Sequence, residues 1–366
     1  MIDTGHSESP RRVVLTGGLG FIGTKMVDRL IDSHEIFVVD NLHPQVHQDR
    51  RRVDELPERV TFLEGDVADP SNMQAVAAFR PHVVVHLAAE TGTGQSLLQS
   101  RRHAEVNVTG TATLLDALAG ADALPERLVI PSSRAIYGEG VWTLASDENV
   151  SAHGLPRDPT RLANGEWLPT GPDGEELGSP LPNNAARSEP RPANVYAATK
   201  LAQENVARAW CIGLGVPLSL LRLQNVYGAG QATGNPYTGV LTFMAKQALA
   251  GEQINVYEGG GIIRDFVNVA DVADALTQAA LDRTQDSLTV DIGSGDAKPL
   301  EEVARLLSEL AGAPEPRLSN DFRAGDVRAA YADIDAAGHA LGFSPKVGLR
   351  DGLRELLSWV GSEVSK

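Results

Sequence analysis

The sequence is poor in cysteine, in basic residues and in long apolar runs. Its 366 residues include one cysteine, Cys211, which excludes an intramolecular disulfide framework and a zinc site built on several thiolates. Asp and Glu (48) outnumber Lys and Arg (32), so the formal net charge of −16 offers nucleic acids and anionic membranes no general attraction. No segment approaches the roughly 20 consecutive apolar residues of a membrane span. These features favour a cytoplasmic protein with neither nucleic acid nor membrane as partner.

The order of apolar residues predicts an α/β fold of about two domains. Residues 1–12 are polar and lack the apolar stretch of a secretory signal, so we expect a frayed tail. After them, β-branched runs alternate with helical patterns, which is typical of a parallel sheet covered on both faces. We expect strands at 13–16, 35–40, 60–63, 82–86, 127–131 and 217–222, and helices at 21–31, 104–118 and 196–212. The predicted architecture is a Rossmann-like doubly wound parallel sheet with a smaller C-terminal substrate domain.

Two stretches interrupt this alternation. Residues 147–194 are rich in glycine, proline and asparagine and show no sustained helical or strand period. Loops of this length are usually functional or disordered. From Asn225 onward, shorter helices with Pro/Gly-rich connections indicate a second domain. We therefore expect a cofactor domain over 12–224, with 147–194 as an insertion, and a second domain over 225–366, of which about 263–292 can return to the first sheet.

A glycine-rich turn follows the first predicted strand. Residues 16–23, Thr-Gly-Gly-Leu-Gly-Phe-Ile-Gly, place glycines where a tight turn and a helix N-terminus approach a pyrophosphate. Asp40 ends the second strand about twenty residues after Gly20, where a carboxylate binds ribose hydroxyls and repels a 2′-phosphate. Asp66, after the third strand, either accepts from an adenine amino group or caps a turn. Together these positions predict NAD rather than NADP.

The reactive residues are expected at the carboxyl ends of the strands, where open parallel sheets bind ligands. Tyr196 and Lys200 are four residues apart on one predicted helix and share a face. An ammonium beside a phenol favours the phenolate, which accepts the proton of an alcohol as a hydride leaves to the cofactor. Ser133 adds a hydroxyl at the end of the fifth strand. Each motif alone also occurs as a surface helix or a cap, and the prediction depends on their convergence.

These motifs together resemble the extended short-chain dehydrogenase/reductases, in particular the NAD-dependent nucleotide-sugar epimerases and dehydratases. The resemblance runs from Val13 to about Leu356. Residues 16–23 resemble the family's cofactor loop, and Ser133 with 135–138 resembles its catalytic serine strand. Tyr196-Ala-Ala-Thr-Lys200 resembles its Tyr/Lys helix. The resemblance implies that Ser133, Tyr196 and Lys200 are catalytic.

The same resemblance implies the binding residues. Asn107 matches an asparagine that supports the active site, Asn225 matches one that contacts substrate, and arginines within 264–267 and 323–328 match those that hold a nucleotide diphosphate. The expected cofactor contacts are Gly17, Gly20, Phe21, Ile22, Asp40, Asn41, Asp66, Val67, Leu87, Ala88, Ala89, Thr91, Asn107, Tyr196 and Lys200. The expected substrate contacts are Thr93, Ser133, Arg134, Asn225, Arg264, Arg323 and Asp326. No residue is expected to bind a metal. The family commonly forms homodimers through the helices that correspond to 95–118 and 196–212.

The resemblance also bears on the reaction. The 4,6-dehydratases of the family carry Asp-Glu after the catalytic hydroxyl, whereas Arg134 and Ala135 stand here, so dehydration lacks its proton shuttle. A 4-epimerase needs the tyrosine, the serine, NAD and a pocket in which a transient 4-keto sugar can rotate. We therefore expect a nucleotide-sugar 4-epimerase acting on a dTDP- or UDP-(6-deoxy)hexose. A 4-ketoreductase or dehydrogenase shares every catalytic residue and stays open, and a non-catalytic binding protein is disfavoured.

Loop sequences refine this comparison. Residues 88–96 and 137–140 and the insertion are similar to bacterial enzymes of the dTDP-L-rhamnose 4-epimerase type. The insertion allows two interpretations. It either folds over the sugar as a lid, with Trp167 as an apolar anchor, or packs as an exposed elaboration on the sheet edge or on another subunit.

Overall fold

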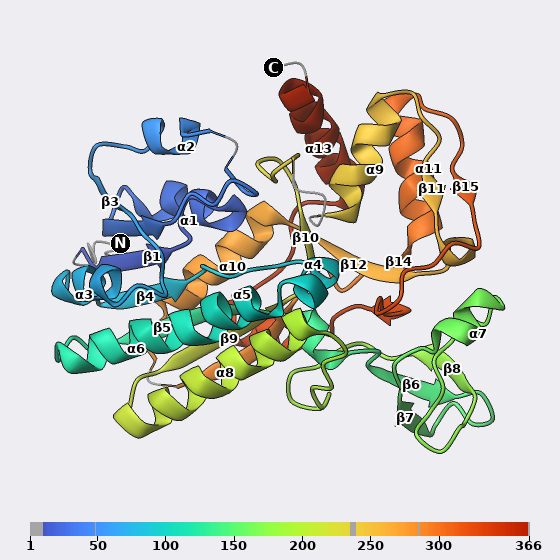
Figure 1. Ribbon diagram of the computed structural model, residues 1–366, viewed down its shortest axis with the longest axis horizontal. Helices are drawn as coiled ribbons and strands as arrows, with labels where there is room; N and C mark the ends of the chain where they lie inside the picture. The colour runs from blue at the N-terminus through green and yellow to red at the C-terminus, as the bar shows by residue number, and fades with distance from the viewer. Residues whose placement is uncertain (1–9, 48, 235–238, 285, 365–366) are drawn as a thin grey trace, which may run out of the picture.

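Seven parallel strands form the central sheet of the protein. The computed structural model describes residues 10–47, 49–234, 239–284 and 286–364. The strand order is β13-β9-β5-β4-β1-β2-β3 (Figure 1). From β1 the chain first adds β2 and β3 on one side and then returns to add β4 and β5 on the other, so the strand order reverses between β1 and β4. The bounds are β1 Arg12–Thr16, β2 Glu35–Asp40, β3 Val60–Glu64, β4 Val83–His86, β5 Arg127–Ser133, β9 Leu218–Leu223 and β13 Leu288–Ile292. The predicted Rossmann-like α/β fold is confirmed, and the reversal opens a crevice at the carboxyl ends of the strands.

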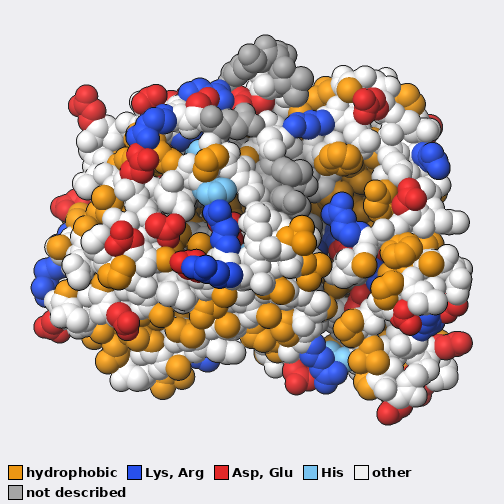
Figure 2. Space-filling model, in the orientation of Figure 1, with side chains coloured by type: hydrophobic (Ala, Val, Ile, Leu, Met, Phe, Trp, Pro, Cys, Tyr) orange, Lys and Arg blue, Asp and Glu red, His pale blue; other side chains and the backbone are white. Residues whose placement is uncertain are grey.

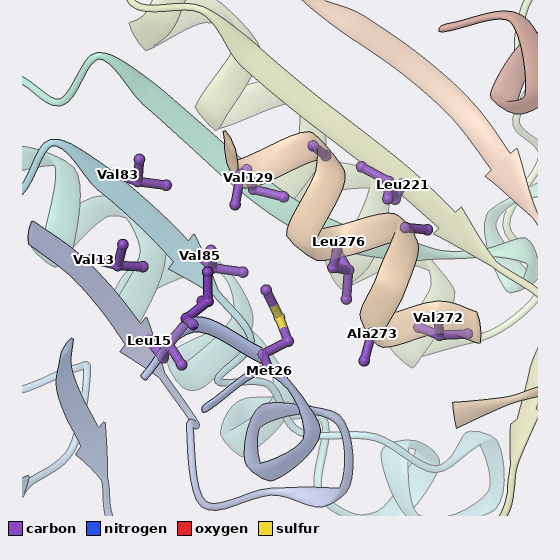
Figure 3. Packing of buried hydrophobic residues seen from close by; sticks show 14 of the residues in the cluster. Val13, Leu15, Met26, Val83, Val85, Val129, Leu221, Val272, Ala273 and Leu276 are labelled. Atoms are coloured by element: carbon purple, nitrogen blue, oxygen red, sulfur yellow. The ribbon is translucent and has the colours of Figure 1, made fainter. Parts of the chain in front are cut away.

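Helices cover both faces of this sheet. One face carries α1 (Phe21–Leu30) and α10 (Val269–Leu281), and the other carries α3 (Pro70–Ala78), α6 (Thr111–Gly120) and α8 (Val195–Leu214). Because side chains alternate along a strand, Val13 and Val14 pack in two separate apolar clusters. Figure 3 shows the first cluster, where Met26 of α1 and Leu276 of α10 lie against the strands. In the described part of the chain, no helix is long and apolar enough to cross a membrane.

The expected elements of the sheet are present, with two informative differences. The helix expected over 104–118 is instead α5 (Ser100–Ala104), a π-helical turn η1 (Glu105–Gly110) and then α6. A π turn adds one residue to a helical turn, and this changes the spacing of apolar residues too little for the turn to be predicted from the sequence. β5 continues to Ser133, two residues past its predicted end. Residues 1–9 of the expected tail lie outside the described residues, but Arg11 is buried and pairs with Glu126 at 2.6 Å, so the tail ends earlier than expected.

The C-terminal part has its own apolar cluster. Three helices pack around it: α9 (Val240–Leu249), α11 (Leu300–Ala311) and α13 (Leu349–Val364) (Figure 1). A small sheet joins β10 (Asn225–Tyr227), β12 (Ile263–Asn268), β14 (Ala297–Pro299) and β16 (Ala329–Ala330), while β11 (Asn255–Val256) pairs with β15 (Arg317–Leu318). α12 (Asp335–Leu341) packs on β13. Within 263–292, β12 belongs to the small sheet and β13 to the central one, and the expected domain boundary stays a prediction.

The insertion has regular structure that the sequence pattern did not reveal. β6 (Val141–Leu144), just before the insertion, pairs with its strands β7 (Ser151–His153) and β8 (Leu177–Pro180), and α7 (Pro159–Ala163) follows β7. Elements of three to five residues are too short to display a period. Arg157 ties the insertion to the C-terminal part, because its guanidinium lies 2.6 Å from a carboxylate oxygen of Glu258 and donates to the Asp326 carbonyl at 2.7 Å. Figure 1 shows this green segment beside that part, away from α1 and α3.

Truncating Leu276 to alanine tests the packing of α10 on the central sheet. Leu276 is fully buried in the first cluster, so Leu276→Ala removes apolar contacts and leaves a cavity. We expect the free energy of unfolding to fall by about 2–5 kcal/mol, measured by urea denaturation. Leu124→Ala, at a side chain that is 39% exposed, is the matched control and should cost far less. Equal losses in the two variants would contradict the assigned core.

Candidate active site

A cleft opens at the carboxyl ends of β1, β2 and β4. The described residues that line it include nine of the expected cofactor contacts: Gly17, Gly20, Asp40, Asn41, Val67, Leu87, Ala88, Ala89 and Thr91. Phe21 and Ile22 begin α1 beside it, while Asp66, Asn107, Tyr196 and Lys200 are absent from its lining. The segment after β2 adds Gln45 and His47, which the sequence analysis did not select. No sequence motif contains these two residues, and they reach the cleft only because of the path that their loop takes.

Asp40 is held in place before any ligand binds. Its carboxylate accepts hydrogen bonds from the backbone N–H groups of Leu19, at 3.1 Å, and Leu42, at 2.9 Å. His47 Nε2 lies 3.2 Å from the same carboxylate. The bond to Leu19 ties the end of β2 to the glycine-rich turn, so the expected ribose and pyrophosphate sites keep a constant separation.

Asp66 forms a local turn in the structure. Its carboxylate accepts from the Ala68 N–H at 2.8 Å and from the Asn41 side-chain amide at 3.0 Å. The N-cap of α3 is Asp69 instead, which accepts from the Ser71 N–H. Asp66 thus makes the turn that one of the two expectations described, and its contact with adenine stays a prediction.

Ser133 and Tyr196 meet at the end of β5. Asn194 caps α8 by accepting from the Ala197 N–H at 2.9 Å, which places Tyr196 in the first turn. Burial raises the pKa of Tyr196, and a hydrogen bond with Ser133 and the positive charge of Arg134 oppose that rise. The positive charge expected beside the phenol was that of Lys200, one turn later. In the structure Arg134 also acts on the phenol, and the effect of Lys200 on it stays a prediction.

Lys200 is buried beneath this pair. Its ammonium donates to the Pro131 carbonyl at 2.9 Å and to the side-chain carbonyl of Gln203. Burial lowers the pKa of Lys200 to about 8, and the charge of Glu204 opposes the decrease. Gln203 is a site residue that the sequence analysis missed, because a glutamine three residues after a lysine is common in surface helices.

Asn107 joins the loop after β4 to α8. From the π turn η1, its side chain accepts from the Glu90 N–H at 2.8 Å and donates to the Glu90 carbonyl and to Thr199 Oγ1, both at 3.0 Å. A buried amide that satisfies three groups on two elements holds them in one relative position. Asn107 therefore has the supporting position that the resemblance implied, without lining the cofactor cleft.

A cluster of charged side chains lies near Arg134. Arg264, which is buried, donates to Asp326 at 2.7 Å and to the Val327 carbonyl at 2.8 Å. Burial and the neighbouring Arg264 lower the pKa of Arg134 to about 10, while Asp326 and Tyr196 oppose the decrease. Arg134 therefore remains a cation at neutral pH.

The other expected substrate contacts do not all lie in this charged cluster. Asn225 Oδ1 is buried and has no hydrogen-bond partner among the described residues. Thr93 begins the short helix α4 (Thr93–Leu98), and the Arg323 side chain is exposed rather than gathered with Arg264. Glu139 and Glu258, which the sequence analysis did not select, hold Arg157 behind the cluster at 3.0 and 2.6 Å.

Comparison with known proteins identifies the family of the chain. The chain matches the sequence profile of the NAD dependent epimerase/dehydratase family over residues 13–159 and 170–293. The chain belongs to this family. It is 43% identical over 359 residues to a dTDP-L-rhamnose 4-epimerase from Burkholderia thailandensis, in a match that covers 97% of this chain and 96% of the relative.

Solved structures of the family share the fold over nearly the whole chain. The UDP-glucose 4-epimerase of Thermotoga maritima, solved with UDP-glucose, has a TM-score of 0.77 at 27% identity and covers 96% of this chain and 99% of its own. The UDP-glucose 4-epimerase of Thermus thermophilus, in complex with NAD, has a TM-score of 0.74 at 28% identity with the same coverage. The predicted family and the predicted cofactor, NAD, are both confirmed.

The turn after β1 fits the dinucleotide that this family uses. Gly17 has a φ of +66°, and a Cβ there would lie 2.7 Å from the Ala88 backbone nitrogen. Gly20 caps α1 without a side-chain hydrogen bond, so N–H groups of the first turn are left for a phosphate. A Cβ on Gly23 would lie 2.5 Å from the Gly18 carbonyl oxygen, which shows how closely α1 approaches the turn. Backbone and helix end together have the close approach and the N–H groups that a pyrophosphate would need.

Adding a methyl group at position 17 tests this fit. We expect Gly17→Ala to strain the turn and push it from Ala88, so the affinity for NAD should fall by about tenfold or more. NAD released from the purified protein by heat and titration of the stripped protein measure the loss. Gly120→Ala is the control, because Gly120 is helical with open space around it. Unchanged NAD retention in Gly17→Ala would contradict the assigned phosphate site.

Proposed function

We propose that this protein is an NAD-dependent nucleotide-sugar 4-epimerase that acts through a transient 4-keto sugar. The observation that carries the proposal is that the Tyr196 and Ser133 side chains are neighbours at the carboxyl end of β5, with Lys200, one helical turn later, donating to the Pro131 carbonyl of the same strand. The 43% identity to a dTDP-L-rhamnose 4-epimerase and the similarity to solved UDP-glucose 4-epimerases support it.

The catalytic residues have separate tasks. The Ser133 hydroxyl orients the C4 oxygen of the sugar. Tyr196 takes the proton of the C4 hydroxyl in its phenolate form, which Ser133 and the charge of Arg134 favour against the effect of burial. NAD held at the glycine-rich turn and Asp40 would supply the hydride acceptor for C4 and the donor for its return to the opposite face. Tyr196 then gives its proton back to the C4 oxygen, so the protein ends each cycle in its starting state. Because the cycle consumes no reducing equivalents, the cofactor can stay bound between turnovers.

The residues after Ser133 favour epimerisation over dehydration. Loss of water from C5 and C6 needs a group that gives a proton and one that takes a proton near those atoms. Ala135 has no titratable group, and Arg134 stays protonated at neutral pH because its pKa is only lowered to about 10. Arg134 is instead suited to hold an anionic part of the substrate.

The substrate we propose is a nucleoside diphosphate sugar, with a dTDP-6-deoxyhexose favoured and a UDP-hexose as the alternative. Arg134 lies beside Tyr196 and near Arg264, and guanidinium groups bind phosphate oxygens in pairs of hydrogen bonds. Arg323, Thr93 and Asn225 would complete the site, with the unpartnered Asn225 Oδ1 accepting from the ligand. The name of the Burkholderia relative supports the deoxyhexose.

The homodimer and the cytoplasmic location stay predictions. Three apolar side chains on the expected dimer helices are strongly exposed: Leu97 at 64%, Leu98 at 85% and Ile212 at 77%. Figure 2 shows apolar side chains gathered along the lower left, where Figure 1 draws α6 and α8. A second copy packed on the expected dimer helices would cover the three exposed side chains, which supports a homodimer.

A panel of dTDP-, UDP- and GDP-hexoses, followed by NMR at C4, tests the proposed activity. We expect protein purified with its own NAD to interconvert one sugar nucleotide with its C4 epimer, without added cofactor and without net NADH. Stoichiometric accumulation of NADH would instead identify a dehydrogenase or 4-ketoreductase. Failure to convert any member of the panel would contradict the proposal.

Removing one oxygen atom from Tyr196 tests its acid/base role. Tyr196→Phe keeps the ring but cannot take or give a proton, so kcat should fall by about a thousandfold or more while NAD stays bound. The steady-state rate and the NAD content of the same sample measure both effects. Tyr257→Phe, at a half-buried tyrosine of the C-terminal part, is the control and should retain full activity. Full activity in Tyr196→Phe would refute the assignment.

A further inference from the structure

A chain of buried hydrogen bonds runs from Lys200 to the end of β1. The Lys200 ammonium donates to Gln203 Oε1, and Gln203 Nε2 lies 2.9 Å from Thr111 Oγ1. His86 Nε2 lies 3.0 Å from the same hydroxyl, and its Nδ1 lies 2.7 Å from Thr16 Oγ1. All five side chains are buried, with exposures of 3% or less. The chain therefore links α8, α6, β4 and β1 beneath the cleft.

Only one arrangement of protons satisfies this chain. The Thr111 hydroxyl donates to the Asn107 carbonyl at 2.8 Å, so it must accept from both Gln203 and His86. His86 then carries its proton on Nε2 and accepts from Thr16 on Nδ1. Burial and the nearby Lys200 lower the pKa of His86 to about 3, which keeps the ring neutral. The amide of Gln203 is thereby locked with its nitrogen toward Thr111 and its oxygen toward Lys200.

The fixed orientation of the Gln203 amide determines how the Lys200 ammonium is held. Two of its three N–H groups are used, by the Pro131 carbonyl and by Gln203 Oε1, and both of these acceptors are neutral. Among the described residues the third N–H is left for a ligand. A carboxylate at position 203 would fill the same volume but neutralise the charge, because glutamate differs from glutamine only in the terminal group.

We propose that Gln203 is a positioning residue for the epimerisation, which fixes the direction of the Lys200 ammonium while leaving its positive charge uncompensated toward Tyr196 and the cofactor. The inference rests on the proposed function for its kinetic consequence. The hydrogen-bond geometry carries the positioning itself. In this role Gln203 touches neither substrate nor cofactor and acts through Lys200.

The other charged and titratable groups near Lys200 and Tyr196 do not perform this task. The elements packed around these two side chains contribute six such groups. They are Glu204 of α8, His86 of β4, Arg222 of β9, Arg134 and Tyr137 of η2 (Arg134–Tyr137), and His103 of α5. Glu204 gives both carboxylate oxygens to Arg222, at 3.0 and 2.8 Å. His86 is neutral, and the ring of His103 packs edge-on against Tyr196 with centroids 6.5 Å apart.

Two substitutions separate positioning from packing. Gln203→Glu places a negative charge against the ammonium, so both limbs of the pH profile of kcat should move to higher pH by about one unit. Gln203→Met keeps the bulk but removes the acceptor, so the alkaline limb should move to lower pH and kcat should fall about tenfold or more. Gln247→Met, at a half-buried glutamine of α9, is the control and should leave the profile unchanged.

A titration without substrate keeps this test independent of the proposed activity. The chain has six lysines, so carbon-13 labelling at lysine Cε gives a simple spectrum in which Lys200→Arg assigns the signal. We expect the pKa of Lys200 to rise in Gln203→Glu and to fall in Gln203→Met. Should the wild-type protein convert no sugar nucleotide, the proposed function fails while this titration still decides the positioning.

The proposal is overturned if Lys200 titrates alike in the wild-type protein and in Gln203→Glu. It is also overturned if both variants lose activity without opposite shifts, since that pattern belongs to damaged packing. If thermal melting shows that Gln203→Met does not fold, Gln203→Glu alone decides, because it preserves the shape of the side chain.

Discussion

The site depends on one contact between two elements far apart in sequence, the hydroxyl of Ser133 at the end of β5 and that of Tyr196 in the first turn of α8. Two local features create it. β5 extends far enough to place the serine at the carboxyl end of the sheet. The Asn194 cap starts α8 at the residue before the tyrosine. Lys200 then reaches back to the Pro131 carbonyl of the same strand. Strand and helix are thereby joined at the place where the chemistry occurs.

Much of this arrangement could be predicted from the sequence, because buried parallel strands read as continuous apolar runs and a glycine-rich turn has few alternatives. Asp40, Gly17 and the Tyr/Lys pair follow from such patterns. The π turn around Asn107 could not, since a single widened turn leaves the apolar spacing almost unchanged. The strands of the insertion could not either, because they are held mainly by partners distant in sequence.

Residues missed at the site share a physical cause. Gln203, Arg157 and Glu258 are polar side chains in segments without motifs, and their burial depends on tertiary contacts that a linear pattern does not contain. The charge of Arg134 beside Tyr196 was not predicted for the same reason. Spacing on a helix places Lys200 on the correct face, but the direction of a long flexible side chain is set by acceptors elsewhere, here Pro131 and Gln203.

The ion pairs of Arg157 have a mechanical consequence. The ion pair with Glu258 and a hydrogen bond to the Asp326 carbonyl attach the insertion to the C-terminal part rather than to α1 or α3. In any hinge motion that changes the width of the crevice, the insertion would therefore move together with the C-terminal part. Opening and closing would then involve two rigid bodies, and the inserted sheet would belong to the body that contains Arg264.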